Sequence, residues 1–202
     1  MNKKFLFLVF CLCFFSVTAF AKIQYAFDPS KNCYIVRTYD MRGDFPSIWL
    51  SYFTKFIDTE KNIEKYIISM DRSAERPINP ISDEAYVSVD GVNYSLEKNY
   101  GNNYLISRTS SKRFYTAFCE FILPEDVISA IKKSPNDNFV VSIFIGGKEN
   151  KFKYKAKLCD DLKKIISLNS SDIDVIVKQN LSKSEKLLKE YNYRRENENQ
   201  QK

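Results

Sequence analysis

Two short apolar runs joined by an Asp-Gly pair most strongly limit how this 202-residue chain can fold. Residues 85–89 and 92–96 are rich in side chains that favour strands, and Asp90 and Gly91 separate them. Both central residues of a type I′ hairpin turn need positive φ angles, which Asp and Gly tolerate. The segment therefore predicts a β-hairpin with Val87 and Val89 on one face.

Further strand-forming segments recur along the chain, separated by short polar turns. Residues 48–57 fit helical periodicity as well as strict alternation, but their Trp, Tyr, Phe, Thr and Ile residues favour a strand. We expect strands at 23–27, 33–39, 48–57, 64–70, 85–89, 92–96, 104–106, 114–123, 139–145 and 151–158. Loops are expected at 71–84, 99–103 and 107–112.

Three segments carry helical signals. Pro124 followed by two acids is typical of a helix start, and this helix would end near Lys133. Residues 160–166 form a second expected helix, and a third spans 169–194 with Ser170 or Ser171 as its cap. Its apolar stripe would be Ile173, Ile176, Val177, Leu181, Leu187, Leu188 and Tyr191. The polar residues 195–202 predict a disordered tail.

These patterns predict a mainly β, α+β fold. Its core would be an antiparallel β-sandwich-like domain over residues 22–168, with one short connecting helix and a C-terminal helix. Hairpins that follow one another along the chain are the reason to expect antiparallel sheets.

The first 21 residues have the pattern of a signal peptide. Lys3 and Lys4 precede an apolar run over residues 5–15, and Ala19-Phe20-Ala21 resembles a cleavage site. The run is shorter than the roughly 20 apolar residues that span a bilayer, which argues against a membrane anchor. We therefore predict export to the periplasm or beyond, with no transmembrane segment after cleavage.

The composition excludes several classes of function. The chain has no His, which rules out Ser-His-Asp triads, Cys-His pairs and His-ligated zinc. Removing residues 1–21 takes away two of the 31 basic residues and none of the 25 acidic ones, which leaves a net charge of +4. That excess is too small for a nucleic-acid binder. No cofactor or metal motif is present, so none is expected.

Three cysteines follow the expected cleavage site, namely Cys33, Cys119 and Cys159. An exported protein can form disulfides, and Cys33 and Cys119 are the candidates for a bridge. The alternative is that all three are buried and act as small hydrophobic side chains. A catalytic thiol is disfavoured because no His can activate one.

Two groups of residues are candidates for binding. Aromatic side chains at Tyr100, Tyr104, Phe114, Tyr115 and Phe118 could line a groove for a sugar or peptide, or could be core residues. Lysines at Lys151, Lys153, Lys155 and Lys157 would share one face of a strand. They could bind an anionic surface. They could also keep an edge strand from pairing with other chains, and we favour this second interpretation. The acid pairs Glu125-Asp126 and Asp160-Asp161 and the Gly146-Gly147 pair are interpreted as helix-start and turn residues.

Residues 85–166 resemble the invasion-associated locus B family of exported bacterial proteins. The resemblance rests on the Asp90-Gly91 hairpin, an aromatic strand through Phe118-Cys119, the helix from Pro124, a β-hairpin and a closing segment at Leu158. It implies a β-sandwich and an exported accessory or binding role. The family usually has more cysteines near its central strand, where this chain has only Cys119, so the resemblance implies no disulfide here.

Three functions remain open from the sequence. The first is a non-enzymatic binding or accessory module whose partner is another envelope protein or an anionic surface component. The second is a small-ligand binding module, which a concave and partly apolar pocket would support. The third is a carboxylate-dependent hydrolase, which would need two acids in one cleft.

The signal-peptide pattern generates a first prediction. In its native host the protein should be cleaved after Ala21, because small residues at positions 19 and 21 fit the processing enzyme. N-terminal sequencing of the exported protein should therefore begin at Lys22. Recovery of chains that keep Met1 in the cytoplasm would contradict the prediction.

Overall fold

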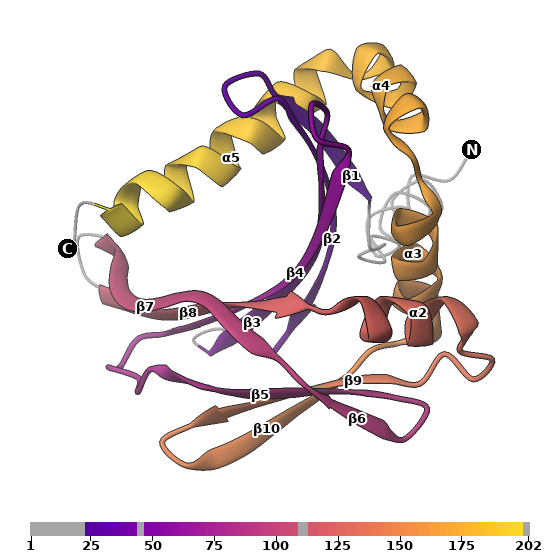
Figure 1. Cartoon of the computed structure of the whole chain (residues 1–202). Helices are drawn as coiled ribbons and strands as arrows, with labels where there is room; N and C mark the ends of the chain where they lie inside the picture. Colours follow the sequence, from indigo (N-terminus) through magenta and orange to yellow (C-terminus); the bar gives the residue numbers. More distant parts are fainter. Residues whose placement is uncertain (1–22, 44–46, 109–112, 200–202) are drawn as a thin grey trace, which may run out of the picture.

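The computed structural model describes residues 23–43, 47–108 and 113–199, which form two antiparallel sheets and four helices (Figure 1). This confirms the expected mainly β, α+β fold. The predicted signal peptide and the last residues of the predicted tail, 200–202, lie outside the described residues.

The larger sheet has six strands in the order β1-β2-β3-β4-β8-β7. Hairpins join β1 to β2, β2 to β3 and β3 to β4, so most neighbours in the sheet are also neighbours in sequence. The strand bounds are β1 Gln24–Asp28, β2 Cys33–Arg42, β3 Ile48–Asp58, β4 Ile63–Ala74, β7 Glu97–Arg108 and β8 Arg113–Leu123.

The smaller sheet has four strands in the order β10-β9-β5-β6. Its strands are β5 Ile81–Val89, β6 Val92–Ser95, β9 Phe139–Ile145 and β10 Lys148–Lys153. Asp90 and Gly91 join β5 to β6 with φ angles of 50° and 87°, and Val87 and Val89 are buried on one face. The predicted hairpin is therefore confirmed.

Four helices complete the fold: α2 Glu125–Lys133, α3 Ala156–Ser167, α4 Ser170–Gln179 and α5 Leu181–Asn199. The helix α2 lies where Pro124 and the two acids predicted it, and Val127, Ile128 and Ile131 form its buried stripe. In place of one C-terminal helix there are two, with a break at Asn180. Residues 195–199 continue α5, so the chain is helical where a disordered tail was expected.

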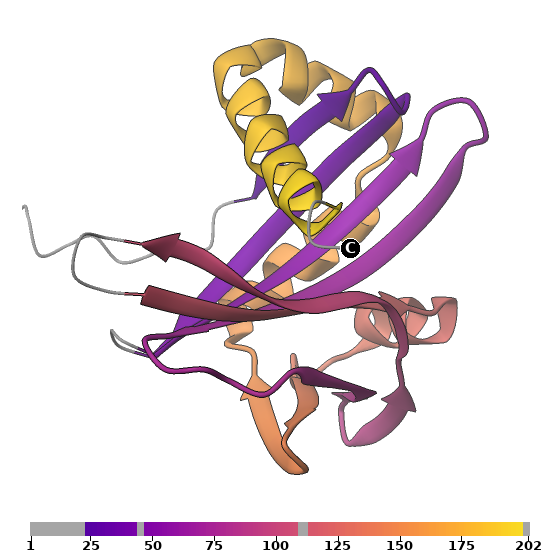
Figure 2. The ribbon, with the colours of Figure 1, turned by 90° about the vertical axis from the view of Figure 1, so that its left-hand side faces the viewer.

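The two faces of the large sheet are covered differently. On the convex face, β7 and β8 pack against β5 of the small sheet, while α3 and α4 pack against β1, β2 and β3. On the concave face lies α5, which crosses the strands (Figure 2). The sandwich therefore covers one half of the sheet and helices cover the other half.

Two expected loops are strands. Within 71–84, β4 continues to Ala74 and β5 begins at Ile81, so the loop is limited to 75–80, which contains both prolines. The Gly-Asn segment 99–103 lies inside β7. Gly101 is required there because a Cβ atom would lie 2.9 Å from the Cys119 Sγ of β8. That close approach between strands is not visible in the sequence.

The predicted strand 151–158 is wrong in its second half. β10 ends at Lys153, and α3 begins at Ala156. Leu158, Leu162 and Ile165 are all buried, and their helical spacing outweighs the alternation of the preceding residues.

Lys55 connects the large sheet to the helices. Its side chain lies in the middle of β3 on the convex face and is only 1% exposed. Its Nζ donates to the carbonyl oxygens of Ile166 at 3.1 Å and Leu168 at 2.7 Å, and it forms an ion pair with Glu64 at 2.8 Å. Carbonyls at a helix C-terminus lack partners within the helix, so the ammonium group stabilises the end of α3.

The candidate bridge between Cys33 and Cys119 does not form. Cys33, Cys119 and Cys159 are all free, and Cys119 and Cys159 are buried as the alternative interpretation requires, whereas Cys33 is only partly buried. Cys33 is in β2 and Cys119 is in β8, with β3 and β4 between them. Three steps of about 4.8 Å between neighbouring strands exceed the roughly 7 Å that a disulfide allows between Cα atoms.

The thiols give a second prediction. Burial raises the pKa of Cys119 to about 12, and also raises the pKa of Cys159, whose Sγ donates to the Asp137 carbonyl at 3.1 Å. Burial raises the pKa of Cys33 as well, but its side chain is only partly buried. At neutral pH, Ellman's reagent should react fastest with Cys33 in the native protein, because it is the most accessible of the three thiols. After denaturation without reductant, a chain that starts at Lys22 should show three thiols.

Cys33→Ser is the matched control, since it should remove the fast native phase and leave two thiols after denaturation. A single thiol in the denatured wild type would contradict the structure.

Lys55 gives a third prediction. Lys55→Met should lower the free energy of unfolding by about 2–4 kcal/mol, because two carbonyls at the end of α3 lose their donor in a buried site. Lys61→Met is the control, because the Lys61 side chain is 70% exposed. Urea unfolding measures both variants, and for Lys61→Met the free energy of unfolding should change by less than about 0.5 kcal/mol. Equal effects of the two substitutions would contradict the role given to Lys55.

Candidate functional site

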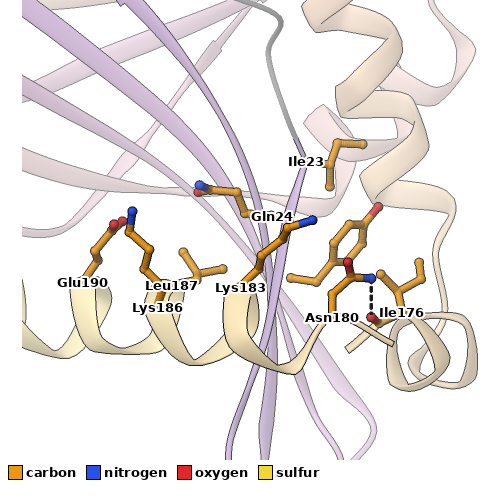
Figure 3. A pocket seen from close by; sticks show the side chains of 9 residues that line it. Ile23, Gln24, Ile176, Asn180, Lys183, Lys186, Leu187 and Glu190 are labelled. Atoms are coloured by element: carbon orange, nitrogen blue, oxygen red, sulfur yellow. Dashed lines mark hydrogen bonds between the residues drawn. The ribbon is translucent and has the colours of Figure 1, made fainter. Parts of the chain in front are cut away.

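A cavity of about 380 Å³ lies between β1, α4 and α5. Both apolar and charged side chains line it, and Figure 3 shows them converging from the strand and the two helices. The lining residues are Ile23, Gln24, Tyr25, Ile176, Asn180, Lys183, Lys186, Leu187 and Glu190.

The path of the chain around β1 creates this cavity. β1 is at the edge of the sheet, so one side of its backbone has no strand partner in the part of the chain that the structure describes. α4 covers the convex face of β1 through Ile173 and Val177, and α5 covers the concave face through Leu187. The connection at Asn180 must therefore pass around the open edge of β1, and the cavity lies inside that turn.

Hydrogen bonds at both helix ends fix the turn. α4 begins with a capping box. The Asp172 N–H donates to the Asn169 Oδ1 at 2.9 Å, and the Asn169 N–H donates to the Asp172 Oδ2 at 3.2 Å. The cap is thus Asn169 and neither of the predicted serines. Asn180 ends α4 by donating from Nδ2 to the Ile176 carbonyl at 3.0 Å. Its own carbonyl accepts from the Lys183 and Ser184 N–H groups and starts α5.

Arg37 holds α5 against the concave face. Its side chain is 5% exposed, and its Nη2 lies 2.9 Å from the Glu190 Oε2 of α5. Its Nε donates to the Gln24 Oε1 of β1 at 2.7 Å, and its guanidinium lies 5.1 Å from the Tyr52 ring centre. Glu190 and Gln24 both line the cavity, so Arg37 fixes two of its walls.

The concave face beyond Arg37 is polar although it is buried. Ser69 Oγ lies 3.5 Å from the Glu120 Oε1, and Asn99 Nδ2 donates to the Glu120 Oε2 at 3.0 Å. Buried polar groups cost stability unless they are paired, so this hydrogen bonding is needed. The buried polar residues of this face include Arg37, Thr54, Ser69, Asp71, Thr116 and Glu120.

The lining residues differ in charge and in exposure. Lys183 and Lys186 are exposed, whereas Leu187 is 2% exposed. Among the described lining residues, Glu190 is the only carboxylate, and Arg37 binds it. Burial and the nearby Asp161 raise the pKa of Tyr25, so its hydroxyl stays protonated at neutral pH. The cavity therefore combines apolar walls with two cations and a neutral hydroxyl.

The predicted aromatic set is only partly brought together. Tyr100 and Phe118 have ring centres 6.2 Å apart, and strand alternation places Phe114 and Phe118 on the concave face. Alternation places Tyr115 on the opposite face, and the Tyr104 side chain is outside the described part of the chain. Tyr100, Phe114, Tyr115 and Phe118, whose side chains are described, do not line the cavity.

The predicted lysine face is wrong as a continuous strip. Lys151 and Lys153 are exposed on β10, which is an edge strand. This is the position in which lysines can keep a strand from pairing with other chains. Lys155 is the residue before α3, and Lys157 lies within that helix. Gly146 and Gly147 form the β9–β10 turn with φ angles of 57° and 76°, as expected.

No metal site or membrane helix is found in the described segments. No three His, Cys, Asp or Glu side chains there are grouped so that they could hold a metal ion. Likewise, none of the helices there has the length and apolar character needed to cross a membrane.

Comparison with known proteins gives no match, whether with family models, curated proteins or solved structures. The resemblance of residues 85–166 to the invasion-associated locus B family therefore stays a prediction.

Sequence reasoning missed the cavity because it treated residues 169–194 as one helix. The sequence did contain a signal of the break between the two helices. The apolar stripe runs through Ile173, Val177 and Leu181, but no apolar residue follows until Leu187. A continuous helix would need an apolar residue near 184, where the chain has Ser. Asn180 at that interruption is a common helix-ending residue.

Proposed function

We propose that this chain is a non-enzymatic binding protein whose small ligand occupies the cavity between β1, α4 and α5. The observation that carries the proposal is the cavity itself, with a volume of about 380 Å³ and a mixed lining. Ligand sites usually have volumes of about 300–1,000 Å³ and combine apolar walls with a few polar groups. This is the second of the three functions that the sequence left open, at a different location from the aromatic strands.

The same site disfavours hydrolysis. A carboxylate-dependent hydrolase needs two carboxyl groups about 5–10 Å apart on either side of the substrate. Glu190 is the only carboxylate among the lining residues, and its Oε2 lies 2.9 Å from Arg37. That pairing leaves no second acid to act with it.

The site also supports a small ligand over a large partner. The strip of four lysines that suggested an anionic surface is divided between β10 and α3. The cavity, in contrast, is bounded on three sides by β1, α4 and α5 (Figure 3). As part of the proposal, the protein acts outside the cytoplasm, for which the support is the signal-peptide pattern of residues 1–21.

The proposal predicts that a neutral apolar molecule binds in the cavity. By isothermal titration calorimetry, 1-octanol should bind the protein at one site with a Kd of about 1 mM or tighter, equivalent to about −4 kcal/mol. Ile176→Phe should weaken this binding at least about tenfold, because the larger ring fills the space beside β1.

Val175→Phe is the matched control, because Val175 is the neighbouring residue, is 53% exposed and does not line the cavity. It should bind octanol like the wild type. Thermal unfolding of both variants checks that they are folded. Absence of octanol binding to the wild type, or equal loss in both variants, would overturn the proposed function.

A further inference from the structure

We infer that the ligand is an amphipathic anion, with a carboxylate bound by Lys183 and Lys186 and an apolar chain that lies against Ile23, Ile176 and Leu187. This inference rests on the proposed function and adds the chemical class of the ligand. It is carried by the separation of charge and apolar surface within the cavity and by the absence of ion-pair partners for the two lysines among the described residues.

The two lysines are available to an anion. None of the ion pairs among the described residues involves Lys183 or Lys186. Lys178, one helix earlier, is in contrast 2.6 Å from Asp174. Because Arg37 binds Glu190, the lining residues carry a net positive charge contributed by Lys183 and Lys186. An anion of opposite charge would be attracted to them.

The helix dipoles at the α4–α5 turn largely cancel. α4 ends at Asn180, and α5 begins at the next residue, Leu181. The negative end of one helix dipole and the positive end of the other therefore lie together. The positive charge at the cavity thus comes from Lys183 and Lys186.

The apolar part of the lining is less exposed than the lysines. Lys183 and Lys186 are exposed, whereas Ile23 and Ile176 are partly buried and Leu187 is buried with Ala26 and Ile35. In Figure 3, Ile176 lies beside the α4–α5 turn and Ile23 at the start of β1, both on the side away from Glu190. A molecule with a charged head and an apolar tail can therefore place its head at the entrance and its tail inside.

Tyr25 fits the same ligand. Its raised pKa keeps the phenol neutral, so it does not repel an anion and retains a hydrogen to donate. A cationic ligand would meet two lysines and no free carboxylate at the entrance. A neutral ligand would fit the walls but leave the lysines without a partner.

Three ligands with the same eight-carbon chain separate these possibilities. Isothermal titration calorimetry should show that octanoate binds at least about tenfold more tightly than 1-octanol, and that octyltrimethylammonium binds more weakly than octanol. Raising the NaCl concentration from about 0.05 M to 0.5 M should weaken octanoate binding and leave octanol binding unchanged.

Charge-reversal variants then locate the anion. Lys183→Glu and Lys186→Glu should each weaken octanoate binding about tenfold while they change octanol binding less than about twofold. Lys183→Arg should retain octanoate binding. Lys189→Glu is the matched control, because Lys189 is an exposed lysine of α5 that does not line the cavity.

The outcomes distinguish the inference from the proposed function. If octanol binds as well as octanoate, and charge reversal at Lys183 and Lys186 has no more effect than at Lys189, the anionic class is wrong and the cavity remains a ligand site. If neither octanoate nor octanol binds, the proposed function is wrong as well. Preference for octyltrimethylammonium would also overturn the inference.

Discussion

Lys55 is a buried cation that joins the sheet to the C-terminal helices, because it holds the point at which the chain leaves α3. Its ammonium group reaches the carbonyls of Ile166 and Leu168, where α3 ends. α4 begins only two residues after Leu168. The place and direction in which the chain leaves α3 therefore determine how α4 and α5 pass around the edge of β1. Replacing such a cation leaves buried carbonyls without donors, which makes the position hard to change.

α5 is held against the sheet by few apolar side chains. It is rich in charged residues, and among its described apolar side chains only Leu187 is fully buried, with Leu188 and Tyr191 packed beside it. Its other described attachments to the sheet include the Arg37–Glu190 ion pair and the contact between the Tyr191 and Phe56 rings, whose centres are 5.8 Å apart. Elements with few apolar contacts open at lower free energy than core strands. Movement of α5 is thus a simple route by which a ligand can enter.

Local signals in the sequence predicted much of the fold. The Asp90-Gly91 hairpin, the α2 helix and the strand at 48–57 depend on residues close in the chain, so short-range rules identified them. Interactions between distant residues account for the errors. Residue 101 is a glycine because its strand pairs closely with β8 at Cys119, and nothing near residue 101 indicates this. The candidate disulfide does not form because strand order, which the sequence does not show, decides which cysteines meet.

The candidate site was harder to predict than the fold. Its residues come from β1 and from helices some 150 positions later, and no motif joins them. Two signals were present nonetheless. Lys55 is the lone lysine of the apolar strand at 48–58. Because Lys is almost never buried without a polar partner, its position indicated that such a partner packs on this strand. The interrupted stripe near Asn180 indicated a second helix.

Amide hydrogen exchange in the presence and absence of octanol tests most directly whether the cavity beside β1 is the binding site. Exchange should slow on octanol addition at residues 23–25, at the start of β1, and in the first two turns of α5, because the ligand bridges these elements and opposes their opening. Exchange in β5, β6, β9 and β10 should stay unchanged, since the small sheet does not line the cavity. Protection confined to β7 and β8, or no protection at β1 and α5, would contradict the account.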